Sequence, residues 1–310
     1  MGKKYDIVTA MDLCVDFLVQ CGNAVPEFGQ KEKLIQDYSI ELGGSASIFA
    51  CQTAKLGLIT AGIGAVGDDY FGSLILDKLY KSGVVTENIR VDNKLKTGMG
   101  AALCMDGGDR AILTYMGTID AVEVTDLSQD IIDNTRHLHI SSFYLMKRLQ
   151  PYYAEIAKKA KKAGATISLD TNWDPDEIWD GGIWDVLPYV DVFLPNENEA
   201  IAITKKSSFS DALKVLSDKV PLIALKKGKY GASAFAAGKS YSADPIDVKI
   251  IDTVGAGDSF DAGFIYGLLS GLDIEKSLRV GCICGSYNTT MPGGIAGQPE
   301  LDKMLSILEG

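Results

Sequence analysis

The sequence has only two histidines, and its six cysteines include no C-x-x-C pair. Structural zinc sites use four Cys or His ligands that lie in close pairs, so no zinc-site pattern is present. His137 and His139 are two positions apart, with one residue between them, and are expected to lie on one face of a strand. Most of the cysteines stand in apolar stretches and are expected to be reduced thiols: Cys14, Cys21, Cys51, Cys104, Cys282 and Cys284.

Basic residues are also few, with 30 Lys and Arg against 41 Asp and Glu, a formal net charge of −11 and a pI near 4.7. Nucleic acids and anionic membranes are bound through clustered Lys and Arg, so this balance argues against both as partners. An anionic ligand would have to be held by local positive groups or by a metal ion.

No apolar run is long enough to span a membrane, and the start MGKKYDIVTAMD has no long apolar core of the signal-peptide kind. We therefore expect a cytoplasmic protein. A length of 310 residues with 46% hydrophobic residues supports a sizeable core, and we interpret residues 1–310 as one large α/β unit.

The most informative stretch is DTVGAGDSFDAGF, residues 252–264, where small residues precede an apolar run. Glycines permit backbone shapes that other residues resist, and the apolar spacing that follows predicts a helix. The amides of Gly255, Ala256 and Gly257 would then lie in the first turn of that helix. Such amides form an anion site.

An acid inside an anion site, here Asp258, would repel a bound phosphate. It makes sense as a general base that takes the proton of a hydroxyl attacking a phosphoryl group. The alternative is a glycine turn in which Asp258 only caps the helix.

The whole string closely resembles the C-terminal signature of the ribokinase-like (PfkB) family of carbohydrate and nucleoside kinases. The resemblance implies that Asp258 is the catalytic base and that Gly255, Ala256 and Gly257 form the anion hole. It also implies ATP and Mg²⁺ as cofactors, and a three-layer α/β/α core with a mostly parallel sheet and a small β-sheet lid.

The resemblance extends to the N-terminal part, where family members place an early strand acid and a Gly-Gly pair that contact the sugar. Asp16, Gly43 and Gly44 match these positions. The family often has Asn four residues after the second glycine, whereas this chain has Ile48, which can line a pocket but cannot hydrogen-bond a hydroxyl.

A second glycine pattern, Gly62, Gly64 and Gly67, formally satisfies the dinucleotide-binding fingerprint G-x-G-x-x-G. In a dinucleotide fold, however, the glycines stand at the first βα turn. Here Asp68 and Asp69 follow the last glycine, and two acids at the end of such a turn would repel a pyrophosphate. We therefore favour a structural role for these glycines, and the family resemblance places this segment on the substrate side of the fold.

From residue 136 onward, apolar strand patterns alternate with helical ones, which predicts a parallel sheet covered on both faces. Ligands on such sheets lie at the carboxyl ends of the strands. The family resemblance places the lid at approximately residues 17–43 and 97–117, the latter a hairpin that turns at 106–109.

The predicted nucleotide side lies at these strand ends. Asn196 and Glu199 form either a helix-capping pair or the family's N-x-x-E motif, in which the acid holds Mg²⁺ through water. The resemblance further implies nucleotide contacts and, at Asp252, a monovalent cation such as K⁺. The nucleotide-binding residues it implies are Asn196, Lys226, Gly228, Gly231 and Asn288.

Acid-sugar kinases of the family tend to carry an arginine after the strand that ends at Asp170, and this chain has TNWDPDEIW there. Without that partner for a carboxylate, we favour a small neutral sugar as the substrate. A nucleoside kinase, an acid-sugar kinase and a binding protein without turnover stay open. A flat lid with an apolar face would also favour a homodimer.

Overall fold

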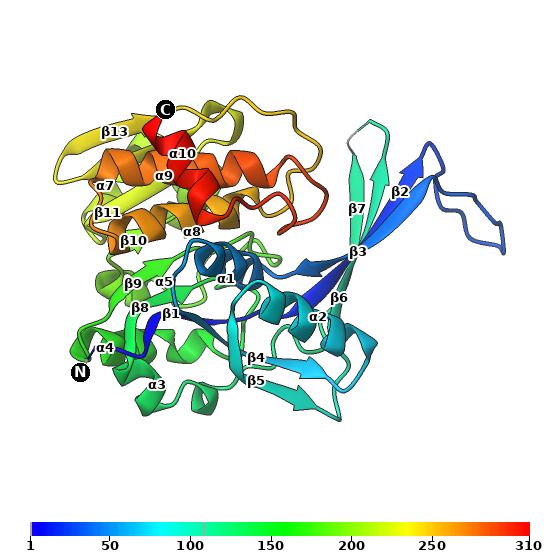
Figure 1. Ribbon diagram of the computed structural model, residues 1–310, viewed down its shortest axis with the longest axis horizontal. Coiled ribbons are helices and arrows are strands. Elements are labelled where there is room, and N and C mark those ends of the chain that lie inside the picture. The colour runs from blue at the N-terminus through cyan, green and yellow to red at the C-terminus, as the bar shows by residue number, and fades with distance from the viewer. Residues whose placement is uncertain (1, 108) are drawn as a thin grey trace.

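The computed structural model describes residues 2–107 and 109–310 (Figure 1). Among these residues, nine strands form one sheet in the order β13-β12-β11-β10-β9-β8-β1-β4-β5. Strands β12 and β13 are antiparallel to their neighbours, and the other pairs are parallel. The strands are β1 Tyr5–Ala10, β4 Thr60–Gly67, β5 Val85–Asp92, β8 Thr135–Ile140, β9 Thr166–Leu169, β10 Val192–Phe193, β11 Leu222–Lys226, β12 Ala232–Ala236 and β13 Lys239–Ala243.

Helices cover both faces of this sheet, as the sequence predicted. The side chains of adjacent strand residues point to opposite faces. Ile7 packs in one buried cluster with Phe49 of α1 and Phe264 of α8, whereas Val8 packs in another with Ile156 of α4. The helices are α1 Ser45–Lys55, α2 Tyr70–Lys81, α3 Gln129–Asp133, α4 Tyr153–Lys162, α5 Ile183–Val186, α6 Glu197–Thr204, α7 Phe209–Ser217, α8 Ala256–Leu269, α9 Ile274–Asn288 and α10 Leu301–Glu309.

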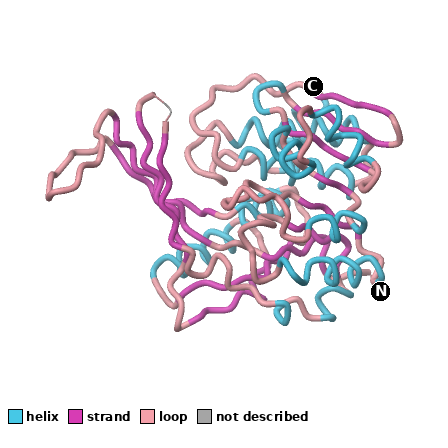
Figure 2. Tube along the Cα trace, turned by 180° about the vertical axis from the view of Figure 1, so that it is seen from behind, coloured by secondary structure: helices cyan, strands magenta, loops and turns pink. Residues whose placement is uncertain are grey.

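A second sheet, which we call the lid, projects from the α/β body (Figures 1 and 2). Its strand order is β3-β2-β6-β7. The turn predicted at 106–109 includes residue 108, which lies outside the described residues. The lid strands are β2 Cys14–Gly22, β3 Asp37–Gly43, β6 Gly98–Met105 and β7 Arg110–Tyr115.

The three glycines of the dinucleotide-like pattern lie inside β4, and α2 begins only at Tyr70 with Asp69 as its cap. A Cβ at Gly62 would stand 2.5 Å from the Met11 sulfur, and one at Gly64 would stand 2.6 Å from Leu13. These glycines therefore allow close packing under the strand and form no phosphate turn.

Within the described ranges, no helix is both long and apolar enough to cross a membrane.

Candidate active site

A cavity of about 760 Å³ opens between the lid and the loops that follow β1 and β9. Its lining brings together residues that stand far apart in the sequence. The predicted substrate and catalytic residues in this lining are Asp16, Gly44, Ile48, Gly255 and Asp258, whereas Gly43 does not line the cavity. The predicted cation ligand Asp252 also lies in the lining. The residues predicted to bind the nucleotide and magnesium do not line this cavity: Asn196, Glu199, Lys226, Gly228, Gly231 and Asn288. Asn196 forms a β-bridge with Lys226 at the end of β11.

The predicted anion hole is the N-terminus of α8. Gly255 caps the helix with φ 72°, a left-handed conformation that favours glycine. A Cβ at Gly255 would stand 2.9 Å from both the Gly294 Cα atom and the Ile48 side chain. The amide of Ala256 donates to the Thr253 carbonyl over 3.3 Å. The helix therefore starts in a tight loop, and Gly255 of this loop lines the cavity, whereas Ala256 and Gly257 are not among the lining residues.

Asp258 follows in the first turn of α8. Burial and the nearby Asp170 carboxylate raise its pKa from 3.8 to about 7, against the lowering effects of Lys226 and Ser45. A general base works best when its pKa is close to the working pH, so this carboxyl is suited to accept a proton near neutrality.

Asp16, in the lid strand β2, faces the same cavity. Burial together with the charges of Asp12 and Asp252 raises its pKa from 3.8 to about 6. A Cβ at Gly43 would stand 2.7 Å from the Asp16 carboxyl, so a glycine is needed beside it. No hydrogen bond to the Asp16 carboxylate is present in the described part of the chain, which leaves its oxygens available for hydroxyl groups.

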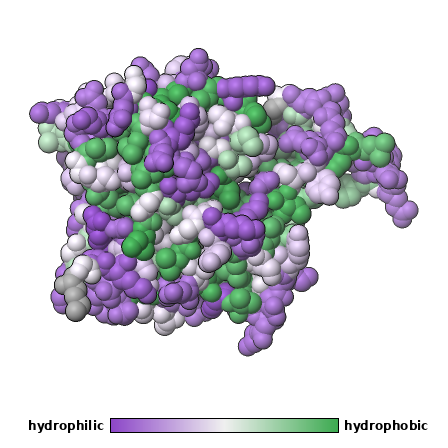
Figure 3. All heavy atoms as spheres, viewed as in Figure 1, coloured by the Kyte–Doolittle hydropathy of each residue, from purple (hydrophilic) through white to green (hydrophobic). Residues whose placement is uncertain are grey.

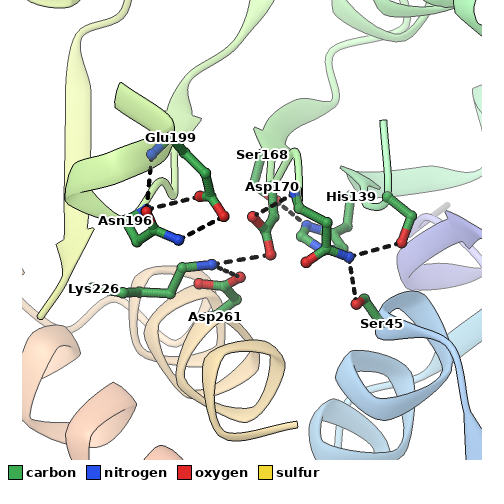
Figure 4. Close-up of polar contacts among 10 residues, drawn as sticks. Ser45, His139, Ser168, Asp170, Asn196, Glu199, Lys226 and Asp261 are labelled. Atoms are coloured by element: carbon green, nitrogen blue, oxygen red, sulfur yellow. Dashed lines mark hydrogen bonds and ion pairs between the residues drawn. The ribbon is translucent and has the colours of Figure 1, made fainter. Parts of the chain in front are cut away.

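Asn196 and Glu199 form a complete capping box at the start of α6. The Glu199 Oε2 atom accepts from the Asn196 amide at 2.8 Å, and Oε1 accepts from the Asn196 side chain at 2.6 Å (Figure 4). Burial and Asp170 raise the pKa of Glu199 to about 7. The capping interpretation is therefore confirmed, and a carboxylate keeps further lone pairs for a metal-bound water.

Lys226, at the end of β11, forms two ion pairs. Its Nζ lies 3.0 Å from the Oδ2 atoms of both Asp170 and Asp261, toward which it points in Figure 4. Burial lowers the pKa of Lys226, but these carboxylates outweigh it and hold the pKa above the ordinary value. In this conformation the ammonium neutralises buried acids beneath the anion hole, 3.8 Å from where a Gly257 Cβ would stand.

The remaining predicted nucleotide residues support loops. Asn288 is buried and donates to the Val254 carbonyl at 2.6 Å, which fixes the chain just before the anion hole. Gly228 and Gly231 both have positive φ in the turn between β11 and β12. A Cβ at Gly231 would stand 2.1 Å from the Ala243 carbonyl oxygen. Contacts of these residues with a nucleotide stay predictions.

Asp252 joins two loops at the cavity edge. Its Oδ1 accepts from the Val254 amide at 3.0 Å, and its Oδ2 accepts from the Gly293 amide at 2.9 Å. The carboxylate thus holds the start of the anion-hole loop against the loop that follows α9.

Sequence reasoning missed Asp12 and Asn172. Asp12 is buried and accepts from the amides of Ser45 and Ala46, both at 3.1 Å, so it caps α1 from a distant loop. Asn172 lines the cavity. Neither residue stands in a pattern that would single it out.

The sequence profile of the pfkB family carbohydrate kinases matches residues 9–301. This chain belongs to that family. It is 31% identical over 272 residues to an ATP-dependent ribose-1-phosphate kinase from Halopiger xanaduensis, with 86% of each chain covered. It is 30% identical to the 2-dehydro-3-deoxygluconokinase of Bacillus subtilis, with 88% of each covered.

The structure of Arabidopsis thaliana ribokinase complexed with ribose and ATP superimposes with a TM-score of 0.85, at 23% identity and full coverage of both chains. The fold is therefore the ribokinase-like one, and the protein is an ATP-dependent sugar kinase of the pfkB family. These relatives carry different substrate names, so the identity of the sugar has to be argued from this chain's own cavity.

Proposed function

We propose that the protein transfers the γ-phosphoryl group of ATP to a hydroxyl of a small neutral sugar. The observation that carries the proposal is that Asp258, with a pKa of about 7, lines the same cavity as the unpaired carboxylate of Asp16. One acid is suited to accept a proton, and the other is suited to hold sugar hydroxyls.

In the proposed reaction, Asp16, Gly43 and Gly44 hold the sugar beside Ile48. Asp258 takes the proton of the attacking hydroxyl while the new bond from that oxygen to the γ-phosphorus forms. The bond between the γ-phosphorus and its bridging oxygen breaks, and ADP leaves with the electron pair. The amides of Gly255, Ala256 and Gly257 stabilise the negative charge on the phosphoryl oxygens.

Magnesium fits this site as an ion held largely by water and nucleotide phosphates, because Glu199 offers a single carboxylate at the edge of the nucleotide side. When bound, Mg²⁺ would neutralise charge on the phosphates. Asp252 offers oxygen ligands for a monovalent cation such as K⁺ beside the anion-hole loop. Turnover that is equal in K⁺ and in choline buffers would remove that cation from the proposal.

The charge of the cavity supports a neutral sugar over an anionic one. Arg110 of the lid is the one basic residue among its described lining residues. Carboxylates accept hydrogen bonds from hydroxyls but repel phosphate or carboxylate groups. The acidic lining residues are Asp12, Asp16, Asp37, Asp109, Asp252 and Asp258.

The lid supports a proposal of a homodimer. All six residues of β7 are exposed, and they include Ile112, Leu113 and Tyr115, while Tyr38 of β3 is exposed as well. Figure 3 shows hydrophobic residues on the projecting lid. Exposed apolar residues on an edge strand favour association with another chain. Sedimentation velocity of wild type and Leu113→Lys would test this, since a monomeric wild type contradicts it.

Release of ADP on a panel of neutral sugars, acid sugars and nucleosides tests the function. We expect one neutral sugar to give turnover that Asp258→Asn lacks, since an amide cannot accept the proton. Turnover with nucleosides alone would keep the mechanism and replace the substrate class. If Asp258→Asn kept wild-type turnover, Asp258 would not be the base.

A further inference from the structure

A closed ring of hydrogen bonds, which we call the polar ring, joins Asp12, Ser45, Ser142 and Asn172. The Asn172 Nδ2 atom lies 2.5 Å from the Ser45 Oγ and 3.0 Å from the Ser142 Oγ. The Ser142 hydroxyl donates to the Asp12 Oδ2 at 2.6 Å, and the same oxygen accepts from the Ser45 amide at 3.1 Å. The ring thus ties the loops after β1, β8 and β9 to the first residue of α1.

The directions of these hydrogen bonds follow from the chemistry of the groups. The Asp12 carboxylate takes the only hydroxyl hydrogen of Ser142, so Ser142 accepts from Asn172. This places the amide nitrogen of Asn172 toward both serines, and its second hydrogen goes to Ser45. The Ser45 hydroxyl therefore keeps its own hydrogen to donate outside the ring.

Asp258 is a carboxylate in the same cavity that can accept this hydrogen. Ser45 and Asp258 line the same cavity, and a side-chain hydrogen bond from Ser45 lowers the pKa of Asp258. The other charged groups that face Asp258 are Lys226, which also lowers its pKa, and Asp170 and Asp12, which raise it. Ser45 is thus a neutral donor among these charges. Figure 4 shows Ser45 at the start of α1, across from Asp170.

The backbone points to the same place. Ser142 and Asn172 both adopt left-handed conformations, with φ 51° and φ 54°. Such conformations are costly for residues other than glycine, and they concentrate at functional sites. In both residues the strained backbone brings the side chain into the polar ring.

We propose that Ser45 and Asn172 are positioning residues that hold the Asp258 carboxylate in the orientation in which it accepts the substrate proton. The inference rests on the proposed role of Asp258 as the base. Asn172 fixes the rotamer of the Ser45 hydroxyl, and Ser45 fixes one oxygen of Asp258 by donating to it. The other oxygen then faces the sugar hydroxyl.

The test is the pH profile of kcat/KM for Ser45→Ala with the sugar that the panel identifies. Loss of a hydrogen bond to a charged group should lower kcat about tenfold and move the acid limb up by about one pH unit. Because neither residue is proposed to carry sugar binding, KM for the sugar should stay within about twofold. Asn172→Ala should likewise lower kcat and move the acid limb to higher pH.

Two matched variants separate positioning from packing. Ser47→Ala removes a buried hydroxyl that has no partner, two residues along the same helix, and should leave the pH profile unchanged. Ser45→Thr keeps the hydroxyl and should restore the wild-type acid limb. If Ser45→Ala unfolds at the assay temperature, Ser45→Thr and Asn172→Ala supply the comparison.

An acid limb in Ser45→Ala and Asn172→Ala that matches wild type, with Asp258→Asn inactive, would overturn this inference and leave the proposed function standing. Activity retained in Asp258→Asn would overturn the proposed function itself, and this inference with it.

Discussion

Lys226→Met is expected to destabilise the fold strongly. The Lys226 Nζ lies 3.0 Å from each of two carboxylates, and the exposed fractions of the Asp170 and Asp261 side chains are only 2% and 1%. Removing one partner of a buried ion pair costs about 3–5 kcal/mol, because it leaves uncompensated charge. Methionine keeps most of the side-chain length, so the loss reports charge more than packing.

The entropy of unfolding is about 2.1 cal/mol/K per residue, so in a chain of 310 residues each kcal/mol shifts Tm by about 1.5 °C, and we expect a drop of about 5–8 °C at pH 7. The drop should depend on pH with a definite sign. Lys226 helps to hold the pKa of Asp170 below its ordinary value of 3.8. A carboxyl whose pKa is lower in the folded state than in the unfolded state stabilises the fold at pH values above its unfolded pKa. This contribution is lost as the pH falls through the folded pKa. The difference in Tm between variant and wild type should therefore narrow as the pH falls below 3.8.

Thermal unfolding followed by circular dichroism at several pH values measures this effect. Lys229→Met, an exposed lysine three residues away, is the matched control. If Lys226→Met had the same Tm as Lys229→Met, the buried ion pairs of Lys226 would not stabilise the fold.

Three further predictions concern the reaction. Because Asp258 must be ionised and its pKa is about 7, kcat/KM should fall tenfold per pH unit below pH 7; a rate that is flat down to pH 5 would contradict this. Gly255→Ala should lose most turnover in a steady-state assay, because φ is 72° at this position and the new Cβ would stand 2.9 Å from the Gly294 Cα atom. A variant with the wild-type kcat would contradict this prediction. Asp16→Asn should raise KM for the sugar about tenfold and leave KM for ATP unchanged, because a charge-assisted hydrogen bond to the sugar is lost. Equal increases in both KM values would show that Asp16 does not bind the sugar.

Local sequence patterns predicted much of the fold. The alternating apolar patterns from residue 136 onward predicted strands and helices that the structure contains there, among them β8, α4 and β9. The small-residue string predicted the glycine turn at the start of α8, because a tight turn ahead of an apolar helix leaves a signature within a dozen residues. Each of these elements is set by neighbours along the chain.

The polar ring could not be predicted in this way. The four residues come from three loops and the start of helix α1, and Asp12 and Ser142 are 130 residues apart. Small polar residues in loops have no periodicity, so only the folded strand order brings them together. The same holds for Lys226, whose charge suggested a phosphate contact and whose partners Asp170 and Asp261 stand 56 and 35 residues away in the sequence.

The place of β1 in the main sheet bears on how the protein folds as it is synthesised. β1 leaves the ribosome first, yet it lies between β4 and β8, and its residue Ile7 pairs with His137. One edge of this apolar strand therefore stays open until some 130 residues more have been made. Pairing over such distances is slow and leaves unpaired strand edges exposed to aggregation. This interior strand therefore keeps one edge unpaired during a long part of synthesis, and chaperones that shield it would limit aggregation of the nascent chain.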